Sequence, residues 1–171
     1  MRFGDFLKAT VLLSAGCATL LAFVTILGIT REDDRVVIYV TAAWWLASIA
    51  IGLSLGARAD TSPPIARLLA DARSQTTLPE LQPGTTLINR LWPLLLATIG
   101  ASVLAFVEPQ VASVAAGFTI IWALAWRRQE RAVLAIEERD GVRFYVDRTS
   151  PFSPIRLIRT PGFGGTYLPV A

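Results

Sequence analysis

The sequence predicts an all-α integral membrane protein with four transmembrane helices, both termini in the cytoplasm, and a small cytoplasmic C-terminal β-hairpin. Two observations carry this prediction: four long apolar runs that contain no Asp, Glu, Lys or Arg, and a concentration of basic residues on one side of them. The runs cover residues 9–29, 36–55, 91–107 and 111–126. Because a helix rises about 1.5 Å per residue, about 20 apolar residues cross a hydrocarbon core of about 30 Å. The first two runs are long enough, and the other two need residues from their flanks or little tilt to span.

The orientation follows from the 16 basic residues, because short loops that carry many of them stay in the cytoplasm. With four spans, the N-terminus, the loop at 56–90 and the tail share one side and contain 14 of the 16. We therefore expect a multi-pass protein of the cell membrane with both termini in the cytoplasm. Its transmembrane domain covers residues 1–126 and its cytoplasmic tail residues 127–171. The use of 15 arginines and one lysine further indicates a bacterial membrane.

The two halves of the transmembrane region resemble each other. Residues 12–24 read LLSAGCATLLAFV and residues 95–107 read LLATIGASVLAFV, with identity at seven of 13 positions. Duplication of a two-helix hairpin is one interpretation. The other is chance matching between segments that are built from few apolar residue types. A duplication predicts that the first and third helices pack alike, and it indicates no activity.

Small residues spaced four apart predict where the helices pack, because lipid provides no hydrophobic drive between helices. Gly52 and Gly56 form a GxxxG pair, and Ala97 and Ala101 share a face of the third helix. We expect these faces to pack the four helices against one another. The alternative is a homo-oligomer in which two copies associate through Gly52 and Gly56.

The central loop contains a short amphipathic segment at residues 63–74. A proline suits the first turn of a helix, and the apolar residues follow the i, i+3, i+4, i+7 spacing: Ile65, Leu68, Leu69 and Ala72. Arg67 and Arg73 accompany them. We expect this helix to lie on the lipid surface.

In the tail, residues 132–138 and 142–146 flank the sequence Arg139-Asp140-Gly141. A three-residue hairpin loop favours a left-handed glycine in last place, so this pattern predicts a β-hairpin with Ile136 opposite Phe144. Continuation of the fourth helix is the alternative, because residues 129–138 are mostly good helix formers. A two-stranded hairpin is barely stable alone. Its apolar face would need cover from the central loop, a second copy or another protein.

Two groups of tail residues are candidates for surface contacts. Arg127, Arg128 and Arg131 directly follow the fourth span, and we expect them to contact anionic lipid. Beyond the hairpin, residues 150–155 have PxxP spacing and predict an extended arm. Phe144, Phe152 and Ile155 are the candidates for contact with a membrane or cytoplasmic protein partner.

The residues that most enzymes and coupled transporters need are missing from the sequence. It contains no histidine, one cysteine, no GxSxG or P-loop motif, and no ionisable residue within the four runs. We therefore expect no catalytic site, no cofactor and no metal. The basic residues flank the spans instead of forming a tract, which argues against nucleic-acid binding. Ser and Thr residues in the runs are able to line a neutral path, although such hydroxyls more often bond to a carbonyl of their own helix.

These observations favour a non-enzymatic membrane component that acts through partners at its tail and central loop. The alternative is a small transporter or permease subunit for an uncharged or lipophilic solute, which a hydroxyl-lined path through the bundle would favour. The third hypothesis is an enzyme that acts on lipid head groups, which would require Asp140 or Asp147 for activity.

Overall fold

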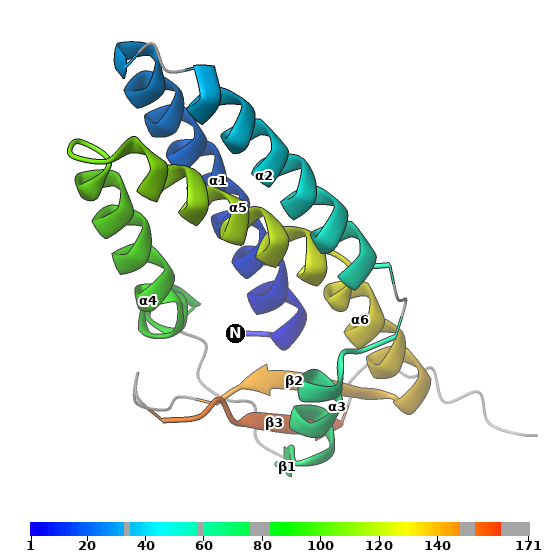
Figure 1. Ribbon diagram of the computed structural model, residues 1–171. Coiled ribbons are helices and arrows are strands. Elements are labelled where there is room, and N and C mark those ends of the chain that lie inside the picture. Colours follow the sequence, from blue (N-terminus) through cyan, green and yellow to red (C-terminus); the bar gives the residue numbers. More distant parts are fainter. Residues whose placement is uncertain (33–34, 58–59, 76–82, 148–152, 162–171) are drawn as a thin grey trace, which may run out of the picture.

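The computed structural model describes residues 1–32, 35–57, 60–75, 83–147 and 153–161 of the 171-residue chain. The helices in this part of the chain are α1 (Phe3–Glu32), α2 (Arg35–Leu55), α3 (Pro63–Ala70), α4 (Pro83–Leu104), α5 (Pro109–Trp126) and α6 (Gln129–Asp140). The strands are β1 (Arg73–Ser74), β2 (Val142–Val146) and β3 (Leu157–Pro161). Helices α1, α2, α4 and α5 form an elongated bundle, and the sheet lies with α3 and α6 at one end of it (Figure 1).

Four helical segments are long and apolar enough to cross a membrane, as the sequence predicts. Helix α4 starts at Pro83, ahead of the third apolar run, and its 22 residues therefore reach about 33 Å. Helix α1 has 30 residues and a length of about 45 Å, which exceeds a hydrocarbon core of about 30 Å. Its first turns therefore extend beyond the apolar part of the bundle.

Helix α5 is the central helix of the bundle. It packs along both α1 and α2 and lies between them (Figure 1). Two indoles of α2 donate hydrogen bonds to its backbone: Trp44 Nε1 to the Val114 carbonyl at 3.3 Å, and Trp45 Nε1 to the Ser113 carbonyl at 3.1 Å. The Ser113 hydroxyl donates to Thr41 Oγ1 at 3.2 Å. These bonds fix the register of α2 against α5.

The predicted small-residue faces differ in what they contact. A Cβ atom added to Gly52 would lie 2.8 Å from Leu124 Cβ and 3.1 Å from Ile121 Cα, and one added to Gly56 would overlap the Leu124 carbonyl oxygen. The glycine pair thus faces α5 of the same chain. On α4, Ala101 is buried and Ala97 is exposed. Helix α4 has no packing against α2 comparable to that of α1 against α5 in the described part of the chain, so the helix contacts do not follow a two-fold repeat.

We call residues 1–7, α3, α6 and the three strands the basal domain. Its sheet has the strand order β1-β3-β2, with β1 parallel and β2 antiparallel to β3. The predicted hairpin is wrong in its pairing. Residues 142–146 do form a strand, but their partner is 157–161, and residues 129–140 form helix α6. The basal domain is therefore built from the N-terminus, the central loop and the tail together.

Gly141 explains why the hairpin pattern was misleading. Its φ of +61° is left-handed, as predicted, but it caps the C-terminus of α6, where its N–H donates to the Glu137 carbonyl. A left-handed glycine serves helix ends as well as hairpin loops. The good helix formers that precede Gly141 favour the helix end over the hairpin loop. The Glu137 carboxylate then accepts a bond from the Phe144 N–H at 2.8 Å, which holds the start of β2 against α6.

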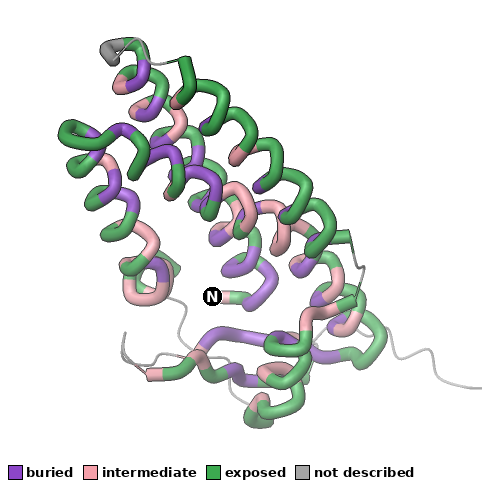
Figure 2. Tube along the Cα trace, viewed as in Figure 1, coloured by how far each residue is buried: buried purple, intermediate pink, exposed green. Residues whose placement is uncertain are grey.

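A hydrophobic core joins the basal domain to the bundle (Figure 2). Its buried members come from α1, α3, α4, α6, β2 and β3: Phe3, Phe6, Leu7, Ile65, Leu91, Val133, Val142, Phe144, Val146 and Leu157. The backbone of residues 1–2 extends the sheet, because Arg2 bridges Tyr145 and the Val146 N–H donates to the Met1 carbonyl at 3.0 Å. Helix α3 directs Ile65 into this core, and Leu68 and Leu69 of its apolar face pack against it. Its expected contact with the lipid surface stays a prediction.

Replacement of Phe3 tests this junction. Phe3 is 1 % exposed, so we expect Phe3→Ala to lower the free energy of unfolding by about 3–5 kcal/mol through the lost contacts and the cavity left behind. The matched control is Phe23→Ala on the same helix, where the side chain is 60 % exposed and the effect should stay within about 0.5 kcal/mol. Thermal and denaturant unfolding in detergent micelles measure the change in the free energy of unfolding for both variants. Equal effects would contradict the role of the N-terminal turns.

Replacement of Gly52 tests the contact between α2 and α5. The new Cβ of Gly52→Ala meets backbone atoms of α5 that cannot rotate away, so we expect a loss of about 1–3 kcal/mol. Gly100→Ala on α4 is the control, because nothing lies within 4 Å of its Cβ position and alanine favours the helix. The same unfolding measurement compares them. A Gly52→Ala protein as stable as the control would show that the two helices do not meet at this point.

Candidate functional site

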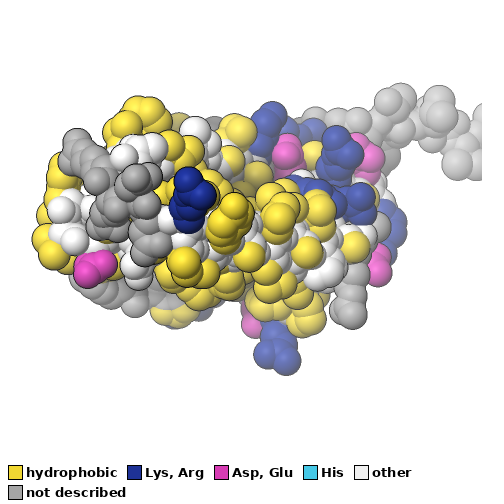
Figure 3. Space-filling model, turned by 45° about the horizontal axis from the view of Figure 1, so that its top comes forward, with side chains coloured by type: hydrophobic (Ala, Val, Ile, Leu, Met, Phe, Trp, Pro, Cys, Tyr) yellow, Lys and Arg dark blue, Asp and Glu magenta, His cyan; other side chains and the backbone are white. Residues whose placement is uncertain are grey.

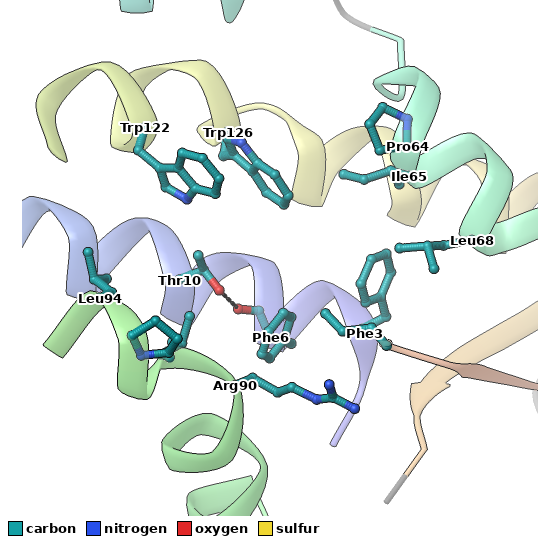
Figure 4. Close-up of a pocket in the computed structure, with 13 residues that line it drawn as sticks. Phe3, Phe6, Thr10, Pro64, Ile65, Leu68, Arg90, Leu94, Trp122 and Trp126 are labelled. Atoms are coloured by element: carbon teal, nitrogen blue, oxygen red, sulfur yellow. Dashed lines mark hydrogen bonds between the residues drawn. The ribbon is translucent and has the colours of Figure 1, made fainter. Parts of the chain in front are cut away.

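A pocket of about 400 Å³ lies where the bundle meets the basal domain (Figure 4). Its walls come from the start of α1, from α3, from the first half of α4 and from the end of α5. Its lining residues are Phe3, Phe6, Thr10, Pro64, Ile65, Leu68, Arg90, Leu91, Pro93, Leu94, Trp122, Trp126 and Ile155. All except Thr10 and Arg90 are apolar. We call this site the basal pocket.

Helix α4 leaves room for the basal pocket because Pro93 lies inside it. A proline within a helix has no N–H to donate and its ring clashes with the preceding turn, which bends or kinks the helix. In Figure 1 the first turns of α4 run in a different direction from the rest. Arg90 stands before this proline and Leu94 after it, so the two side chains line different parts of the pocket (Figure 4).

Two tryptophans of α5 form an apolar wall of the pocket. Trp122 and Trp126 are four residues apart, so they share one face of the helix, and their rings stack with centroids 5.4 Å apart and an interplanar angle of 13°. Trp122 on α5 is 50 % exposed, and Pro93 on α4 and Pro64 on α3 are also exposed, so the pocket reaches the molecular surface along these helices.

Arg90 is the one charged residue among those that line the pocket. Its Nη1 donates a hydrogen bond to the Ser153 carbonyl, while its Nη2 is buried and has no hydrogen-bond partner. The carboxylate of Asp147 acts on Arg90 electrostatically, but no ion pair joins the two. Almost no polar surface faces the pocket, so Arg90 lines it through the carbon atoms of its side chain, while its guanidinium is bonded to the backbone at Ser153.

The predicted lipid-contact arginines lie at the junction between α5 and α6. Arg127 is half-buried, Arg128 donates to the Ala57 carbonyl at 2.6 Å, and Arg131 is exposed. Charged side chains gather at the basal end of the molecule, whereas hydrophobic side chains cover most of the bundle (Figure 3). This surface suits contact with anionic head groups.

The predicted partner contacts are less accessible than expected. Phe144 is 3 % exposed and belongs to the basal core, which removes it from contact with a partner. Ile155 is half-buried and lines the basal pocket. Phe152 lies outside the described residues. The apolar face that was expected to need a partner is thus covered by α1, α3 and α6 of the same chain.

The hydroxyls of the bundle do not form a polar path. Thr10, Thr19, Thr25, Ser48, Ser54, Thr98, Ser102 and Thr119 each donate to a carbonyl of their own helix, at 2.7–3.0 Å. The space between α1, α4 and α5 is packed with apolar side chains instead: Leu21, Ala101, Ala105, Ala112 and Ala116. Ser14 differs from the other hydroxyls, because its Oγ is buried without a partner.

The sequence did not distinguish Arg90 from other flanking arginines. It marked Arg90 only as a basic residue close to the third span. The available signal was local: Arg90 is followed by Trp92 and Pro93, so a cation, an indole and a helix-bending residue meet at the expected membrane boundary. The contributions of Phe3 and Phe6 carried no such signal, because they depend on how far α1 extends below the bundle.

No protein-family model, no curated protein and no solved structure matches the chain. In the described residues, no group of three or more His, Cys, Asp and Glu side chains is placed to hold a metal ion.

Ser14 and Ser48 allow a direct comparison of an unpaired and a paired hydroxyl, since both residues are 0 % exposed. Ser14→Ala removes a buried polar group that has no partner, and we expect it to raise the free energy of unfolding by about 1 kcal/mol. Ser48→Ala removes a bond to the Trp44 carbonyl, so we expect a loss of about 0.5–1 kcal/mol. Unfolding in mixed micelles measures both. A loss of stability in Ser14→Ala would show that its hydroxyl has a partner.

Proposed function

We propose that the protein is a non-enzymatic, multi-pass component of the cell membrane that binds a lipid or another lipophilic molecule in the basal pocket. The observation that carries this proposal is the apolar cavity of about 400 Å³, whose lining includes exposed residues of α4 and α5. Its volume lies within the range of about 300–1,000 Å³ that is common for small-molecule sites. Apolar and aromatic walls are typical of such sites.

The proposed orientation places the basal domain in the cytoplasm. The basic residues support it, because 14 of the 16 belong to segments on the basal side of the four spans. In this orientation the pocket lies at the level where the inner leaflet meets water. Lipids of that leaflet then reach the opening between α4 and α5 without leaving the membrane.

The aromatic wall suggests how the pocket holds a hydrocarbon chain of a lipid. A hydrocarbon chain that comes from the bilayer is already in an apolar environment, so burial in the pocket adds little hydrophobic free energy. Affinity must come from close fit against rigid walls and from polar contacts. The stacked rings of Trp122 and Trp126 supply a flat, rigid surface for the first of these.

A transporter or permease subunit for a lipophilic solute is the second candidate, and the same pocket favours it. The bundle offers such a transporter no polar path in its described part. Hydroxyls such as those of Thr25 and Thr98 bond within their own helices, and apolar side chains fill the space between α1, α4 and α5. An accessory role through a protein partner, or through a second copy, has less support. It was predicted from the absence of catalytic residues and from a tail that was expected to need cover, and Phe144, Tyr145 and Ile158 of that tail are all buried.

Filling the pocket tests the proposal. Leu94 lines the cavity, so the larger side chain of Leu94→Trp should occupy the space of a bound chain. We expect photolabelling by a lipid with a diazirine in its acyl chain to fall about tenfold, which corresponds to about 1.4 kcal/mol of overpacking. The full chain in membrane vesicles is labelled, digested and read by mass spectrometry.

Leu96→Trp is the matched control. It introduces the same side chain on the same helix at a position that is 61 % exposed, outside the pocket, and should leave the labelling of Phe6 and Trp122 peptides unchanged. Equal labelling in both variants, or labelling spread evenly along the outer faces of the helices, would overturn the proposed function.

A further inference from the structure

We propose that the basal pocket binds a single hydrocarbon chain of a membrane lipid and selects the chain alone, while the head group stays outside the cavity. This inference rests on the function proposed above, because it names the part of the lipid that the pocket recognises. Three features support it: the polarity of the lining, the size of the cavity and the places where the cavity reaches the surface.

The first feature is the polarity of the lining. Almost no polar surface faces the cavity, although Thr10 and Arg90 are among the described residues that line it. The Thr10 hydroxyl donates to the Phe6 carbonyl of its own helix at 2.8 Å (Figure 4). The Arg90 guanidinium donates to the Ser153 carbonyl through Nη1, and its Nη2 is buried. A phosphate or ester group inside the cavity would therefore lose its water without gaining a hydrogen bond, which is unfavourable.

The second feature is the size of the cavity. A volume of about 400 Å³ has room for about 13 groups that each occupy about 30 Å³, as a water molecule does in the liquid. A methylene group is of similar size, so the cavity holds about a dozen chain carbons. This is less than one chain of an ordinary membrane phospholipid and far less than two. The pocket is therefore suited to one chain, and a second chain of the same lipid stays in the bilayer.

The third feature is where the cavity reaches the surface. Its lining extends from Leu94 and Trp122 of the bundle to Pro64 and Ile65 of α3 in the basal domain (Figure 4). Both Trp122 and Pro64 are exposed. With the basal domain in the cytoplasm, the end at Pro64 lies towards water and the end at Trp122 towards the bilayer. A lipid of the inner leaflet has the same direction, so the carbons next to its head group lie near Pro64 and the end of its chain near Trp122.

The test uses three probes that carry the same diazirine-labelled acyl chain: a phosphatidylcholine, a phosphatidylglycerol and a lysophosphatidylcholine. Each probe is added to vesicles that contain the full-length protein, and the labelled peptides are identified by mass spectrometry. Labelling of the pocket peptides is divided by labelling of the exposed Leu46 peptide on α2, which corrects for general attraction of a lipid to the protein. We expect the three probes to agree within about threefold, because only the labelled chain enters the pocket.

The position of the diazirine tests the direction of the chain. A diazirine close to the head group should label the α3 peptide that contains Pro64 and Ile65. A diazirine close to the end of the chain should shift the label to the α5 peptide that contains Trp122. The reverse pattern would overturn the inference.

Two variants of Thr10 test whether its hydroxyl takes part. Thr10→Val keeps the shape of the side chain and removes the hydroxyl, and Thr10→Ser keeps the hydroxyl. We expect both variants to be labelled like the wild type, within about threefold, because the hydroxyl bonds to its own helix. A loss of labelling in Thr10→Val that Thr10→Ser does not share would show that the hydroxyl binds the lipid, and would overturn the inference.

The remaining outcomes separate this inference from the proposed function. A preference above about threefold for one head group, or labelling by the lysolipid that is weaker by the same factor, would overturn the inference. The lipid pocket itself would stand in that case if Leu94→Trp still blocked the labelling. No labelling of the pocket peptides by any of the three probes would overturn both.

Discussion

The structure depends on one helix that belongs to both of its parts. Helix α1 is longer than a bilayer core, so its first turns carry Phe3, Phe6 and Leu7 out of the bundle and into the basal core. The same turns supply one wall of the basal pocket, and the residues before them, Met1 and Arg2, supply an edge contact for β2. A two-stranded or three-stranded sheet has little stability without cover on its faces. The N-terminal turns provide that cover, and they make the sheet, the pocket and the bundle parts of one packed unit.

The spans were predictable because they depend on local composition. Length and polarity decide whether a segment crosses a membrane, and neither requires knowledge of other segments. The basal domain was not predictable in the same way, because its strands pair over distance. Val142–Val146 was recognised as a strand, but its partner Leu157–Pro161 lies beyond a segment with no strand pattern. Gly141 was assigned the correct left-handed conformation and the wrong role, since hairpin loops and helix ends use glycine alike.

The basal pocket could not be predicted from the sequence for a related reason. Its lining comes from five stretches of the chain that meet only in the folded molecule, at Phe6, Ile65, Arg90, Trp122 and Ile155. The apolar residues among them are indistinguishable in sequence from core or lipid-facing residues. Arg90 was counted as one of the charges that set orientation, a role that any flanking arginine fills. Its unpaired Nη2 becomes visible only when burial and hydrogen bonds are known.

Arginines at this boundary therefore act in two physically different ways. An exposed arginine such as Arg131 contributes about 1 kcal/mol of attraction to an anionic surface, and salt screens that attraction within about 10 Å. It does not distinguish one anionic lipid from another. A buried guanidinium interacts at low dielectric, where a hydrogen bond to a charged group contributes about 1.5–3 kcal/mol and an unmade bond carries a penalty of similar size. Arg90 differs because it is partly buried, bonds the Ser153 carbonyl through Nη1 and leaves Nη2 buried without a partner. Exposed arginines thus favour a general attraction to anionic membrane surfaces, whereas Arg90 joins α4 to the tail of the same chain.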